Sequence, residues 1–103
     1  MSEIALVWSD SITLPSLTAK KVLTTYARLH RKDKPIEISI SDLEKKLGIS
    51  KTAIYRAIDT LIEHRLITKH TQHDERGGQL PNLVYLKIPQ TFIDEYTVDG
   101  VTK

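Results

Sequence analysis

Apolar residues recur every three or four positions in three segments of the chain, a spacing that predicts amphipathic helices. The segments are 17–30, 41–48 and 51–65. Ser16 or Thr18 can cap the first helix through a side-chain oxygen. The side chains expected to converge in one core are Ala19, Val22, Leu23, Tyr26, Leu43, Leu47, Ile54, Ile58, Leu61 and Ile67.

The second and third helices follow each other closely enough to form a helix-turn-helix. Ser41 and Glu44 have the spacing of a capping box that opens the second helix. Gly48 stands where helices commonly end in a left-handed residue, and Ser50 is an N-cap candidate for the third helix. A plain helical hairpin with an ordinary solvated face is the alternative interpretation. The outward face of the third helix carries Lys51, Thr52, Tyr55, Arg56, Asp59 and Glu63.

Apolar–polar alternation and β-branched residues predict three short strands. They cover 36–40, 66–72 and 82–88, and a charged, glycine-containing hairpin tip at 73–79 joins the last two. Pro89 ends the last strand. The order helix, strand, helix, helix, strand, strand predicts an α+β fold in which a three-helix core carries a small antiparallel sheet.

Two flanking segments lie outside the predicted domain, which covers 16–88. The N-terminal arm, 1–15, contains an apolar run too short for an independent helix. We expect a strand or an extended arm, with Trp8 as a packing anchor. The C-terminal segment, 89–103, is either a brief terminal helix or the start of a linker. Because both segments carry apolar residues outside the three-helix core, we predict a homodimer.

The composition is that of an ordinary globular domain, with 40% hydrophobic and 27% charged residues in 103. The chain has no cysteine, which excludes disulfides and thiolate metal sites. No apolar run approaches the roughly 20 residues that cross a bilayer. The first residues lack the basic region of a signal peptide. A cytoplasmic, nucleoid-associated protein with no membrane partner is therefore expected.

Positive charge is concentrated in the middle of the chain. Residues 20–76 hold thirteen of the fifteen Lys and Arg against eight acidic residues, a balance of +5, whereas the two ends together carry −3. This distribution favours a domain that places one face on a polyanion. A merely well-solvated surface is the alternative.

Several short motifs together resemble the winged helix-turn-helix superfamily. They are Leu43 and Leu47-Gly48-Ile49-Ser50, the run Leu61-Ile62-Glu63-His64-Arg65-Leu66-Ile67, and Asn82 followed by Tyr85. Within the superfamily, the likeness is greatest to the amino-terminal DNA-binding domains of phage and plasmid replication initiators and replisome organisers. The sequence departs from their pattern at four places: Glu44 replaces an alanine, the Thr-Val pair is shifted to Ala53-Ile54, Arg65 replaces a glycine, and one extra residue separates Asn82 from Tyr85. An arginine can continue the helix where a glycine would end it.

The resemblance implies that the second helix of the pair enters the major groove of double-stranded DNA by its amino-terminal half. Arg56 is the first candidate for guanine, and Thr52 for a thymine methyl group or a phosphate. Tyr55 either contacts DNA through its hydroxyl or lies over the helix surface. Lys20 and Lys21 are expected near the DNA backbone. The full set of predicted DNA-binding residues is Ser41, Lys45, Lys46, Ser50, Lys51, Thr52, Tyr55, Arg56, Lys69 and, before two glycines at the wing tip, Arg76.

Catalysis and metal binding have little support in the sequence. His70 and His73 have a spacing that can bind zinc, but they lie on a hairpin with no thiol and no evident fourth ligand. No phosphate-cradling glycine loop or nucleophile elbow is present. We therefore expect no cofactor, no metal and no enzymatic activity. Two functions remain: a sequence-specific DNA-binding protein acting in transcription or replication, and a winged-helix protein–protein interaction module.

Overall fold

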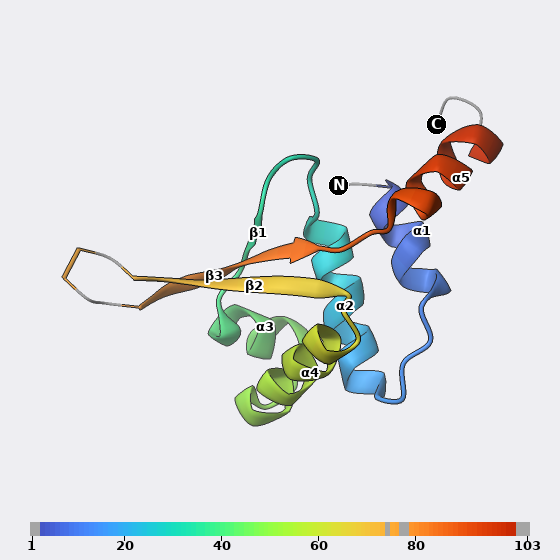
Figure 1. Cartoon of the computed structure of the whole chain (residues 1–103). Coiled ribbons are helices and arrows are strands. Elements are labelled where there is room, and N and C mark those ends of the chain that lie inside the picture. The colour runs from blue at the N-terminus through green and yellow to red at the C-terminus, as the bar shows by residue number, and fades with distance from the viewer. Residues whose placement is uncertain (1–2, 74, 77–78, 101–103) are drawn as a thin grey trace.

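A computed structural model describes residues 3–73, 75–76 and 79–100, which form five α-helices and one three-stranded antiparallel sheet (Figure 1). The strands lie in the order β1-β3-β2. The elements are α1 (Glu3–Ser11), α2 (Leu17–Leu29), β1 (Ile36–Glu37), α3 (Ile40–Leu47), α4 (Lys51–Glu63), β2 (Ile67–His73), β3 (Gln79–Leu86) and α5 (Gln90–Gly100).

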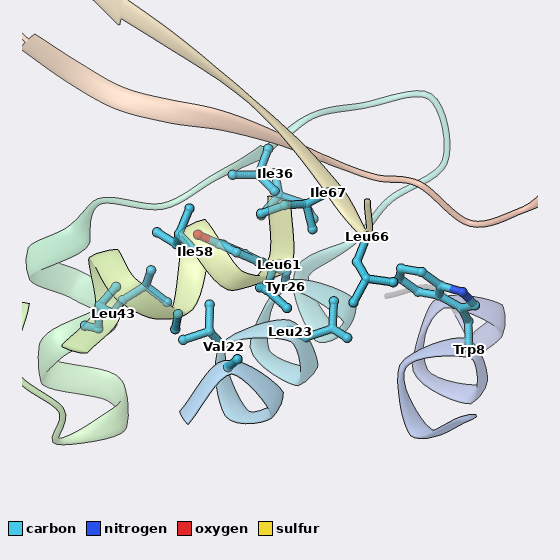
Figure 2. Close-up of a cluster of buried hydrophobic side chains, with 14 residues drawn as sticks. Trp8, Val22, Leu23, Tyr26, Ile36, Leu43, Ile58, Leu61, Leu66 and Ile67 are labelled. Carbon is cyan, nitrogen blue, oxygen red and sulfur yellow. The ribbon is translucent and has the colours of Figure 1, made fainter. Parts of the chain in front are cut away.

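The core forms where α2, α3 and α4 pack beneath the sheet, and Figure 2 shows its side chains converging from all of these elements. Nine of the ten predicted core residues are buried, and the tenth, Leu47, is half-buried against them. Ile36 and Val84 add the underside of the sheet. This arrangement confirms the α+β winged helix-turn-helix fold. Burial of Tyr26 raises the pKa of its hydroxyl above the usual range.

The hairpin of β2 and β3 projects away from the helices as the wing (Figure 1). The limits of all three predicted strands are wrong, although only by one residue for β2, which covers Ile67–His73 rather than 66–72. The first strand ends at Glu37 rather than at residue 40, because Ser39 and Ile40 begin α3. The last strand covers Gln79–Leu86 rather than 82–88. Three residues of the predicted tip, at 74, 77 and 78, lie outside the described part of the chain.

The N-terminal segment is a helix, so the predicted strand or extended arm is wrong. Local sequence alone does not stabilise so short a helix, but tertiary contacts do. Trp8 is 2% exposed and belongs to the core cluster, as expected of a packing anchor. The Lys20 ammonium group of α2 donates to the carbonyl oxygens of Ser9 and Ile12 at the C-terminal end of α1. Helix α1 also contacts α5, which matches the brief terminal helix expected there.

Serine side chains begin three of the helices. Ser16 and Ser50 cap α2 and α4 as predicted, each accepting from a backbone amide at 3.2 Å. The predicted capping box of Ser41 is wrong, because the Ser39 hydroxyl caps α3 by accepting from the amide of Asp42 at 3.0 Å. Gly48 ends α3 with φ +65°, in the left-handed conformation that was predicted.

Arg65 does not continue α4, which corrects the expectation drawn from its place in the sequence. The helix ends at Glu63, and Arg65 adopts the left-handed conformation, with φ +59°. The Arg65 amide donates to the Ile62 carbonyl at 2.9 Å, and the Leu66 amide to the Leu61 carbonyl at 3.0 Å. These two bonds define a Schellman motif with arginine in the position that glycine usually occupies.

Candidate nucleic-acid interface

Helix α4 turns one side to the core and the opposite side to solvent. Its buried residues, Ile54, Ala57, Ile58 and Leu61, recur at helical spacing and fix this orientation. The N-terminal half of the outward side carries the four residues predicted to contact DNA there, all of them exposed: Lys51, Thr52, Tyr55 and Arg56.

The outward side of α4 also changes charge along its length. Lys51 and Arg56 lie in the first two turns, whereas Asp59 and Glu63 are exposed farther along. Within the described part of the chain, no salt bridge joins these basic and acidic side chains. A polyanion is therefore attracted to the beginning of α4 and repelled from its end.

A groove of about 270 Å³ lies on one flank of α4, between α3 and β3; we call it the α3–β3 groove. One cation and several hydroxyl or amide groups face this space. The Asn82 Oδ1 atom is buried and has no hydrogen-bond partner. The polar and proline lining comprises Ser39, Ser41, Lys51, Tyr55, Pro81 and Asn82.

A β-bulge brings Asn82 to this groove. Between the pairs His70–Leu83 and Gln72–Leu80, β2 advances by two residues and β3 by three, so β3 holds one extra residue. Pro81, which lacks an amide hydrogen, lies in the bulge. The Gln72 amide group donates to the Pro81 carbonyl at 2.8 Å and to the Glu37 carboxylate at 2.7 Å, which ties the bulge to both neighbouring strands.

A second groove, of about 290 Å³, lies on the other flank of α4, between α4 and the beginning of α2; we call it the α2–α4 groove. Its polar lining is again hydroxyl groups with one cation. The Thr60 hydroxyl donates to the Arg56 carbonyl at 3.0 Å and is thereby fixed in place. The polar residues are Ser16, Thr18, Ser50, Thr52, Arg56 and Thr60.

The remaining predicted contact residues lie outside both grooves. Lys45 and Lys46 are exposed on the last turn of α3. Lys69 is half-buried on β2 opposite Val84, and Arg76 is exposed near the wing tip. The expectation that Lys20 approaches the DNA backbone is wrong, because its ammonium group is bonded to the end of α1.

The grooves also contain residues that were not predicted as contacts. The sequence predicts Ser16 and Thr18 only as helix-cap candidates and Ser39 as part of a strand, and it assigns Thr60 and Asn82 no role at the site. The extra residue between Asn82 and Tyr85 did not signal the bulge, because the strands pair in register from Leu83 to Tyr85 and the bulge lies between Leu80 and Leu83.

The described residues contain no group of three or more histidine, aspartate or glutamate side chains placed to hold a metal ion. None of their helices is both long and apolar enough to span a membrane.

The sequence was compared with known proteins. The model of the MarR family matches residues 27–77, about half of the chain. The match runs from the end of α2 through α3, α4 and β2 into the wing, and so contains the whole helix-turn-helix. It agrees with membership of the winged helix-turn-helix superfamily. No curated protein matches the chain. The likeness to replication initiators stays a prediction.

Proposed function

We propose that the chain is a sequence-specific double-stranded DNA-binding protein that regulates transcription, with α4 in the major groove. The observation that carries the proposal is the exposed N-terminal half of α4, where Lys51, Thr52, Tyr55 and Arg56 form one basic, hydrogen-bonding surface. Residues at the beginning of a recognition helix are the ones that reach base edges. The MarR family match over the helix-turn-helix supports the same function.

Each predicted residue has a proposed role in this complex. Arg56 donates to guanine, and Thr52 contacts a thymine methyl group or a phosphate. Lys51 and Tyr55 on α4, and Ser41 and Ser50 beside it, are proposed to contact the DNA backbone. At the edges of the surface we propose that Lys45, Lys46 and Lys69 contact phosphates and that Arg76 enters a narrow minor groove.

A salt titration of duplex binding tests the proposal. Each phosphate contact lowers the slope of log affinity against log salt concentration by about 0.9. Mobility-shift measurements at several salt concentrations, on a duplex selected from a random pool and on its scrambled counterpart, should give a steep slope on both and tighter binding to the selected one. A salt-independent interaction, or equal affinity for both duplexes, would refute sequence-specific DNA binding.

We further propose that the protein acts as a homodimer on two half-sites. One recognition helix contacts few base pairs, and pairing two of them along the duplex is the usual remedy. Helix α1 offers an apolar residue for such an interface, because Val7 is 41% exposed. Light scattering that gives a monomer, both free and on the selected duplex, would remove the dimer.

A role in replication rather than transcription rests on the sequence resemblance alone. A winged-helix protein–protein interaction module is the second candidate, and the exposed Tyr55 and Ile62 on α4 are the observation that favours it. A module of this kind would leave duplex DNA unbound in the same titration, so one experiment separates the two functions.

A further inference from the structure

We propose that the two grooves beside α4 bind the sugar-phosphate backbones of DNA. The α3–β3 groove binds the backbone of one strand, and the α2–α4 groove binds that of the other. The inference rests on the proposed function and adds to it which residues hold which strand. It assigns Asn82 and Thr18 as DNA-contacting residues.

The two grooves lie on opposite flanks of α4. Tyr55 lines the α3–β3 groove, and Thr60 lines the α2–α4 groove. Five residues at 100° each place these two side chains about 140° apart around the helix axis. The exposed residues on the arc between them are Thr52 and Arg56, which also line the α2–α4 groove, and the acidic Asp59 and Glu63 farther along the helix. The grooves therefore border the outward face of α4 on its two sides.

The diameter of a helix and the width of the major groove fit this arrangement. An α-helix with its side chains is about 10–12 Å in diameter, and the major groove of B-DNA is about 12 Å wide. A helix that fills the major groove must have one backbone along each flank. Two hollows of similar volume, about 270 and 290 Å³, lie on these flanks.

The side chains that line the two grooves suit phosphate binding. Hydroxyl groups line both grooves: Ser39 and Ser41 beside the cation of Lys51 on one side, and Ser16, Thr18, Ser50 and Thr60 on the other. Arg56 also lines the second groove but keeps its proposed contact with guanine. Of the residues that the structure describes, no acidic one lines either groove. Arginine, lysine and hydroxyl side chains are the groups that most often contact phosphate oxygens.

Asn82 distinguishes the α3–β3 groove from an ordinary polar hollow. Its Oδ1 atom is buried without a partner, although buried polar atoms are normally hydrogen-bonded. The bulge at Pro81 holds the residue there, and the Gln72 side chain fixes the bulge. An amide group has two donors besides its oxygen, so Asn82 can donate to a phosphate while its oxygen accepts from Lys51, Ser41 or Tyr55.

Substitutions that introduce a single negative charge test each groove separately. Thr18→Asp places a carboxylate in the α2–α4 groove, and it favours folding because acidic residues stabilise the first turn of a helix. Leu17→Asp is the matched control: it adds the same charge in the same turn, but Leu17 is 71% exposed and lines neither groove. Asn82→Asp adds a nearly isosteric charge to the α3–β3 groove, with Thr13→Asp, at an exposed residue that lines neither groove, as its control.

We expect Thr18→Asp and Asn82→Asp each to weaken binding to the selected duplex by about tenfold, and the two controls to weaken it far less. The melting temperature of each variant should remain within a few degrees of wild type. Equal losses for a variant and its control would overturn the assignment of that groove.

The strand assignment is tested with duplexes in which single phosphates are replaced by uncharged methylphosphonates. For the wild-type protein, sensitive positions should appear on both strands along one major-groove segment. Neutralising the phosphate that faces residue 82 should restore binding by Asn82→Asp, and neutralising one on the opposite strand should restore binding by Thr18→Asp. If neutral phosphates on one and the same strand restored binding by both variants, the assignment of one groove to each strand would be overturned, while DNA binding itself would stand. Failure of the unmodified protein to bind any duplex would overturn the proposed function as well.

Discussion

Replacing Arg65 by glycine should make the protein more stable. Arg65 holds φ +59° at the end of α4, where the contact between Cβ and the backbone costs an ordinary residue about 1–2 kcal/mol. Glycine removes that cost. Glycine also loses more backbone entropy on folding than other residues, which lowers the stability by about 0.5–1 kcal/mol. The net gain is about 0.5–1 kcal/mol.

The arginine side chain adds little that would be lost in this exchange. Arg65 is exposed, and its hydrogen bond to the Ile62 carbonyl is made by the backbone amide, which glycine retains. For a domain of this size, the expected gain raises the melting temperature by about 2–8 °C. Thermal unfolding followed by circular dichroism measures it directly.

Two further variants separate the backbone effect from the loss of charge. Arg65→Ala removes the same side chain but keeps Cβ, so it should not stabilise the protein. Asp33→Gly changes the other non-glycine residue with positive φ, at +63°, and should gain less, because aspartate visits this conformation more readily. A melting temperature for Arg65→Gly at or below that of the wild type, or equal to that of Arg65→Ala, would refute the reasoning.

Four other predictions concern single side chains. Leu61→Ala should lower the free energy of unfolding by about 2–5 kcal/mol, because the side chain is fully buried; a loss under about 1 kcal/mol in a urea titration would contradict its place in the core. Arg56→Ala should cost roughly 1–3 kcal/mol on the selected duplex and relax one base pair of the preference, whereas equal losses on selected and scrambled duplexes would make Arg56 a phosphate contact. Lys20→Met should leave the carbonyls at the end of α1 unpaired, cost about 1–3 kcal/mol and accelerate amide exchange in α1 before other helices; uniform exchange would contradict it. Burial lowers the pKa of His30 below its usual value, so its contribution is present above about pH 6.5 and is lost as the pH falls; His30→Gln should flatten the melting temperature between pH 7 and pH 5, and an unchanged pH profile would exclude this.

The helices and their faces were predictable because they follow from spacing within one segment. Lys51 and Arg56 were found this way, since a single helix places them. The N-cap of α3 was not predictable in this way. Ser39 and Ser41 each have an acidic residue three positions later, so the spacing of a capping box does not choose between them. The structure chooses Ser39, as β1 ends two residues before it.

The missed features depend on contacts between distant segments. Helix α1 is too short to be stable alone, and Lys20, eleven residues beyond Ser9, completes its end. The α3–β3 groove combines residues 39–41, 51–55 and 81–82, which no local pattern connects. Arg65 shows a third limit: its sequence favours a helix, but burial of Leu66 against the core requires the chain to turn there.

The position of Trp8 gives the protein a built-in optical reporter of one boundary. It is the single tryptophan in the chain, and its ring lies at the edge of the core cluster, beside Leu23 and Leu66 (Figure 2). Its fluorescence emission therefore depends on whether α1 is docked, while far-ultraviolet circular dichroism sums over all the helices. If α1 detaches before the three-helix core melts, emission will shift to longer wavelength at a lower temperature than the ellipticity falls. Coincident curves would instead mean that α1 and the winged helix unfold as one cooperative unit.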